Sequence, residues 1–110
     1  MTNETTSKPE ITPEAAASAS AEQRPTVLFF SSAFCDPCTA ARRTLDEVST
    51  LVPNVDYAEL DVARHPDEAE RAGIVSTPTI VLVAANGHEV FRAHGAPTVN
   101  QMLVALAKAV

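Results

Sequence analysis

Basic residues, cysteines and long apolar runs are all scarce in this sequence. Eight Lys and Arg stand against fourteen Asp and Glu, for a formal charge of −6, and there is no basic stripe to bind phosphates. The two cysteines are too few for a scaffold held by several disulfides. No apolar run is long enough to span a bilayer. These shortages argue against a nucleic-acid binder, a membrane-spanning protein and a disulfide-rich secreted scaffold.

The chain does contain enough apolar material for one buried core. Apolar residues make up 45% of its 110 residues and charged residues 20%, a composition typical of a single globular domain. Residues 1–20 are polar and acidic, without the basic cluster and apolar stretch of a secretory signal. We therefore expect a single-domain protein located in the cytoplasm.

The first 24 residues differ in composition from the rest and form a separate N-terminal segment. Residues 1–10 hold too little apolar surface to offset the entropy cost of ordering, and they predict a disordered tail. Thr12 and Pro13 suit the start of a helix over 15–21, but its Ala and Ser face would dock weakly. Helix and disorder both remain open there, and the domain proper is predicted over residues 25–110.

Strand and helix patterns alternate along this domain. A continuous apolar run over 26–31 indicates a strand covered on both faces, as in a parallel or mixed sheet. The segment 39–51 has helical apolar spacing, and 55–62 reads as a second strand. A helical crossover between these strands predicts that they are parallel.

The second half of the domain predicts a short helix, a hairpin and a final helix. The helix runs from His65 to Ala72, and Gly73 ends it. Strands over 79–84 and 88–92 are joined by Asn86-Gly87, a strong hairpin signal. A capping box opens the last helix, at 98–110. The fold class is therefore α/β, with a central mixed sheet flanked by helices.

Both cysteines lie in one motif, Phe34-Cys35-Asp36-Pro37-Cys38, between a predicted strand and a predicted helix. The helix N-terminus favours an anion, so we expect a lowered pKa for the Cys35 thiol. A thiolate attacks disulfides, and Cys38 lies one turn later, where it can displace a mixed disulfide. Pro37 fits the first helical turn because no donor is needed there. The motif predicts thiol–disulfide exchange.

Two other readings of the cysteine pair are inert buried thiols and half of a metal site. A zinc site needs further ligands, and His65, His88 and His94 lie at spacings that match no zinc finger. We therefore predict no metal and no bound cofactor, because the Cys35–Cys38 pair itself carries the electrons.

From Thr26 to Val110 the chain resembles the thioredoxin family. The likeness rests on the cysteine motif, on Gly73-Ile74-Val75-Ser76-Thr77-Pro78-Thr79, on the Asn86-Gly87 hairpin and on Gly95 before the last helix. The resemblance implies a thioredoxin-like fold with a sheet of four strands. Whether residues 1–11 add the family's fifth strand stays open, because they hold little that favours one.

The resemblance also assigns roles to residues. Pro78 would be cis and would face Cys35, and the backbone of Thr77 would pair with an extended substrate segment. Gly95 would keep the substrate groove open, and Phe34, Asp36 and Pro37 would line it.

The implied function is reduction of protein disulfides, with a cellular reductase as electron donor. Three alternatives remain: a glutaredoxin-like enzyme that uses a low-molecular-weight thiol, a binding module without catalysis, and an iron–sulfur or copper-binding protein.

This sequence departs from the family pattern beside the cysteines. Phe29 stands where the family usually has a buried Asp, Ser31 where it has Trp, and Glu59 where it has Lys. We predict that burial raises the pKa of Glu59 and makes it the proton acceptor for Cys38. The alternative is a solvated acid at a strand end.

Asp36 places a negative charge between the two cysteines. This charge opposes a thiolate at Cys35, unless water screens it. A less stabilised thiolate makes a weaker oxidant, so we predict a potential nearer roughly −270 mV than −120 mV.

Overall fold

The structure is a computed structural model that describes residues 24–109. The tail over 1–10, the helix over 15–21 and the optional fifth strand over 1–11 lie outside the described residues. Seven elements follow in the described part: β1 (Thr26–Ser31), α2 (Asp36–Leu51), β2 (Asp56–Asp61), α3 (Pro66–Arg71), β3 (Thr79–Val83), β4 (Glu89–His94) and α4 (Val99–Ala109).

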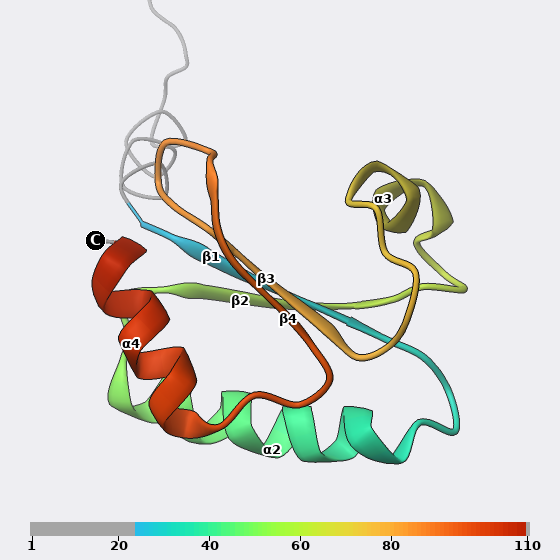
Figure 1. Cartoon of the computed structure of the whole chain (residues 1–110), viewed down its shortest axis with the longest axis horizontal. Helices are drawn as coiled ribbons and strands as arrows, with labels where there is room; N and C mark the ends of the chain where they lie inside the picture. Colours follow the sequence, from blue (N-terminus) through green and yellow to red (C-terminus); the bar gives the residue numbers. More distant parts are fainter. Residues whose placement is uncertain (1–23, 110) are drawn as a thin grey trace, which may run out of the picture.

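The four strands form one mixed sheet in the order β2-β1-β3-β4 (Figure 1). β1 and β2 are parallel, with Phe29 opposite Glu59. β3 runs antiparallel to both β1 and β4, and the β3–β4 ladder has a bulge at Leu82/Val83. The predicted parallel pair, the hairpin and the four-stranded mixed sheet are therefore confirmed.

Helices cover both faces of the sheet. α2 and α4 lie on one side and α3 lies on the other (Figure 1). Along β1, Val27 and Phe29 enter the core cluster beneath α2 and α4, while Phe30 enters the smaller cluster beneath α3. Since successive side chains of a strand point to opposite faces, a strand buried on both faces has to be apolar throughout. This explains the continuous apolar run of the sequence.

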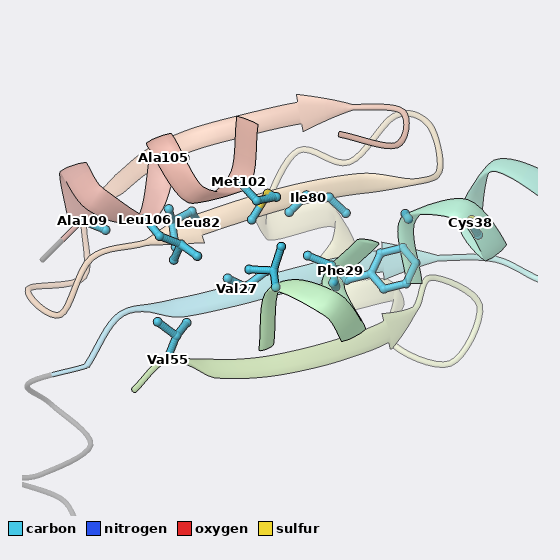
Figure 2. Packing of buried hydrophobic residues seen from close by; sticks show 13 residues of the cluster. Val27, Phe29, Cys38, Val55, Ile80, Leu82, Met102, Ala105, Leu106 and Ala109 are labelled. Carbon is cyan, nitrogen blue, oxygen red and sulfur yellow. The ribbon is translucent and has the colours of Figure 1, made fainter. Parts of the chain in front are cut away.

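The larger core cluster reaches the cysteine motif. It joins β1 and β3 to the apolar faces of α2 and α4, and Figure 2 places Cys38 on α2 at the end of the cluster nearest Phe29. Cys38 is only 1% exposed. Packing in the larger core cluster therefore holds the Cys38 sulfur in place.

The elements α2 and β4 differ most from their predicted ranges. α2 begins at Asp36 rather than Thr39, because Cys35 caps it and Pro37 occupies its first turn. β4 runs from Glu89 to His94 rather than over 88–92, since its pairing with β3 continues as far as Thr79.

Candidate active site

Cys35 and Cys38 form a disulfide at the junction of β1 and α2. Cys35 is the N-cap of α2 with extended backbone angles, φ −115° and ψ 101°, and Cys38 lies one turn into the helix. Cys35 is half-buried whereas Cys38 is buried. An incoming sulfur therefore reaches Cys35 and is kept from Cys38 by the core.

The first turn of α2 directs backbone donors at Cys35. The Cys38 N–H donates to Cys35 Sγ over 3.1 Å. The same N–H also donates to the Cys35 carbonyl oxygen, at 3.1 Å. The helix macrodipole adds partial positive charge at the same place. Both effects stabilise negative charge on the Cys35 sulfur when the disulfide is reduced. Asp36, exposed in the same turn, adds an opposing negative charge.

The loop before β3 lies against the cysteine motif. Its Thr77–Pro78 bond is cis, and Pro78 is fully buried. Thr77 Oγ1 lies 3.9 Å from Cys35 Sγ, so segments more than forty residues apart meet at the disulfide. The Gly95 N–H donates to the Pro78 carbonyl over 2.8 Å, which ties the end of β4 to the same loop. The structure thus brings together Cys35, Thr77, Pro78 and Gly95.

Two large apolar side chains stand in solvent on the segments that meet here. Phe34, directly before Cys35, is 107% exposed, and Val75, two residues before Thr77, is 86% exposed. Phe34 has a φ of +57°, in the left-handed region that bulky residues rarely adopt and that costs about 1–3 kcal/mol. The exposed ring of Phe34 is available to contact another molecule.

The structure contradicts the predicted pKa shift of Glu59. Its side chain is 38% exposed, and its carboxylate accepts hydrogen bonds from Arg42 over 2.6 and 3.0 Å and from Ser31 over 2.8 Å. The Arg42 guanidinium holds the pKa of Glu59 below its usual range, against a smaller opposing effect of partial burial. The expectation of a raised pKa was wrong because the sequence did not reveal this cation.

Arg42 and Ser32 are the two neighbours of the site that the sequence prediction missed. Arg42 lies one turn after Cys38, and its guanidinium stands 5.6 Å from the centre of the Phe29 ring. Its position on the helix put Arg42 near the motif, but no local pattern showed that it would meet Glu59 and Phe29. Ser32 Oγ lies 2.7 Å from Thr77 Oγ1, and no local pattern predicts a contact across such a separation in the chain.

Among the residues that the structure describes, no group of three or more His, Cys, Asp and Glu side chains is placed to hold a metal ion.

Comparison with known proteins gives a family by sequence and a matching fold by structure. A family model described as the thioredoxin-like domain matches residues 12–109 of this chain. A thioredoxin of Methanocaldococcus jannaschii is 36% identical over 80 residues, which are 72% of this chain and 88% of the relative. Thioredoxin-1 of Saccharomyces cerevisiae is 32% identical over 79 residues, 72% of this chain and 76% of the relative.

Among solved structures, the thioredoxin of Fasciola hepatica superposes with a TM-score of 0.73. The match covers 89% of this chain and 91% of that one, at 22% identity, and it confirms the fold. With the family-model match, the relatives and the Cys35–Cys38 disulfide, the chain is a thiol–disulfide oxidoreductase that belongs to the thioredoxin-like family.

Proposed function

We propose that Cys35 is the attacking sulfur and Cys38 the resolving sulfur in the reduction of disulfides of other proteins. The observation that carries this assignment is the unequal exposure of the two sulfurs, half-buried at Cys35 and 1% exposed at Cys38. The Cys38 N–H in the first turn of α2 donates to the same outer sulfur, where the helix dipole also favours negative charge.

The cycle needs two electrons and no further group. The Cys35 thiolate attacks one substrate sulfur, so a mixed disulfide forms and the other substrate sulfur leaves as a thiolate. Cys38, once deprotonated, attacks Cys35 Sγ, which releases the second substrate thiolate and leaves the Cys35–Cys38 disulfide. A reductase of the cell then returns two electrons and two protons to the pair. We infer that no bound cofactor takes part.

The substrate groove lies between the cysteine turn and the Pro78 loop. The backbone of Thr77 pairs with an extended segment of the substrate, and Pro78 and Gly95 shape the floor beside Cys35. Phe34, Asp36 and Pro37 form the opposite wall. Support comes from the 3.9 Å approach of Thr77 to Cys35 and from the Gly95–Pro78 hydrogen bond.

The proposed partners are disulfide-containing proteins and a reductase, in the cytoplasm. No helix in the part of the chain that the structure describes is long and apolar enough to cross a membrane.

Residues 25–110 are proposed as the redox domain and residues 1–24 as a separate N-terminal segment.

Insulin reduction tests this function. With dithiothreitol as electron source, the protein is expected to precipitate the insulin B chain, and Cys35→Ser is expected to abolish that activity. Activity that survives in Cys35→Ser would overturn the assignment of the attacking sulfur, and an inactive parent would point to a binding module. Oxidised protein that is reduced by glutathione but not by a flavin reductase would favour the glutaredoxin-like alternative.

A further inference from the structure

Two hydroxyl groups from distant parts of the chain meet beside the Cys35 sulfur. Ser32 follows β1 directly, and Thr77 precedes the buried Pro78, 45 residues later. Ser32 Oγ and Thr77 Oγ1 are 2.7 Å apart, and Thr77 Oγ1 is 3.9 Å from Cys35 Sγ. Both contacts are partly buried, where water competes less for hydroxyl donors than it does at the surface.

The number of protons decides what this chain of hydroxyls can do. Thr77 has one hydroxyl proton, which it gives either to Ser32 or to the sulfur. The short contact between the two oxygens allows either to be the donor. When Ser32 donates to Thr77, the Thr77 proton is free to point at Cys35 Sγ. When Thr77 donates to Ser32, the sulfur loses that donor.

Negative charge on Cys35 selects between the two arrangements. When Cys35 is a thiolate, Ser32 donates to Thr77 and Thr77 donates to Cys35 Sγ. Both O–H dipoles then point toward the negative charge. Hydrogen bonds to an ionised acceptor are about twice as strong as neutral ones, and bonds in a chain strengthen one another. The thiolate then has a donor from the Pro78 loop in addition to the Cys38 N–H of α2 at 3.1 Å.

We propose that Ser32 is a positioning residue that aims the Thr77 hydroxyl at the Cys35 thiolate and so stabilises the attacking form of the protein. This inference rests on the proposed function, because it takes Cys35 to be the reactive sulfur. The hydroxyl that hydrogen-bonds the Cys35 sulfur belongs to Thr77, and Ser32 acts through its own hydrogen bond to Thr77.

The test compares the thiolate-to-thiol ratio of Cys35 in the reduced full-length protein and in Ser32→Ala. The ratio is followed by the ultraviolet absorbance of the thiolate across pH and by the rate of iodoacetamide alkylation. We expect Ser32→Ala to lower the ratio at neutral pH about threefold, by loss of part of one charge-assisted hydrogen bond. The midpoint potential should fall, because the hydrogen bonds to a thiolate are charge-assisted and the reduced form therefore loses more stabilisation than the disulfide.

Four further variants make the result specific. Ser32→Thr keeps the hydroxyl and should restore the parent ratio. Thr77→Val removes the donor, and adding Ser32→Ala to it should change nothing more. Ser49→Ala is the matched control, because the Ser49 hydroxyl donates to the Asp46 carbonyl within α2, outside the hydroxyl chain that reaches Cys35.

The inference is overturned if Ser32→Ala titrates like the parent, if Ser32→Thr fails to restore it, or if the effects of Ser32→Ala and Thr77→Val add. Insulin reduction by the parent protein is scored separately. If the parent protein is active but Ser32→Ala leaves the thiolate-to-thiol ratio of Cys35 unchanged, only the positioning role is refuted. If the parent protein is inactive, the proposed function is refuted.

Discussion

At the scale of single residues, the charge at Asp36 is the feature that separates this motif from one with a neutral residue between its cysteines. Asp36 is exposed in the first turn of α2, directly after Cys35. Its carboxylate opposes the thiolate that the helix N-terminus favours, and water screens part of that repulsion. The reduced form of the pair is therefore less stabilised than the helix alone would make it.

Asp36→Asn should raise the midpoint potential of the Cys35–Cys38 pair. We expect the parent to lie near roughly −270 mV and the variant about 10–20 mV higher, the size of an exposed charge interaction. The measurement is equilibration with glutathione or a reference dithiol. A parent value above about −200 mV, or a variant that is more reducing than the parent, would contradict this prediction.

The sequence predicted the residues of the site better than their electrostatics. The cysteine pair follows from its place between a strand and a helix, and family resemblance suggested the cis bond before Pro78. The neighbours of Glu59 could not be predicted in this way, because Arg42 comes from another element and Ser31 reaches it across the sheet. The alternation of a strand predicts the side of the sheet on which a side chain lies. It does not predict which charged groups lie next to that side chain.

At the scale of elements, the Arg42–Glu59 pair ties α2 to β2, the outer strand beside β1. Both side chains are more than a third exposed, so the pair is worth below about 1 kcal/mol. Since the pKa of Glu59 is lowered in the folded protein, the stabilisation is present above the unfolded pKa. It is lost as the pH falls through the folded pKa.

Glu59→Gln should therefore destabilise the protein by about 0.5–1 kcal/mol at pH 7 and much less at pH 3. Urea unfolding at the two pH values measures the difference. Resolution of a mixed disulfide should keep its rate, because a carboxylate held by Arg42 is a weak base. Glu47→Gln on α2 is the control, since Glu47 makes no ion pair with the described residues. A slowed resolving step would return Glu59 to the role of proton acceptor.

Element boundaries were predicted best where a cap or turn residue marks them. Thr98 and Gln101 exchange hydrogen bonds of 2.8 and 3.0 Å at the start of α4, as the capping box predicted. The apolar spacing of α2 begins only at Thr39, three residues after the helix starts, whereas its first turn is marked by Pro37 and by Cys35, whose sulfur accepts the Cys38 N–H. Propensity rules give no such weight to cysteine as a helix cap.

At the scale of the whole molecule, the two faces of the sheet are unequally covered. The face under α2 and α4 holds the larger core cluster, whereas the other is covered by α3, a helix of six residues. There the buried residues are Phe30, Ala69 and Val81. The smaller cluster therefore depends on one aromatic ring.

Phe30→Ala should cost about 3–5 kcal/mol, a large part of the 5–15 kcal/mol typical of a domain. The ring is 1% exposed, so its removal leaves a cavity under α3. Denaturant unfolding measures the loss. Leu28→Ala, at a half-buried position of the same cluster, is the milder comparison. A loss below about 1 kcal/mol for Phe30→Ala would show that α3 contributes little to the stability of the fold.

The order and type of the strands and helices follow from local patterns, because apolar periodicity and turn residues act over short distances. The order of the strands in the sheet needed the crossover rule and the hairpin as well. What local patterns did not predict, such as Ser32 beside Thr77 or the guanidinium of Arg42 beside Phe29, depends on how the finished layers stack.

The uneven access to the two sulfurs also has a practical use. The chain has only two cysteines, and the core shields Cys38 from reagents that can reach Cys35. A bulky maleimide dye added to the reduced protein should thus couple at one known position without any engineered site. Fluorescence anisotropy of that label would then report directly when a large molecule docks at this end of the domain.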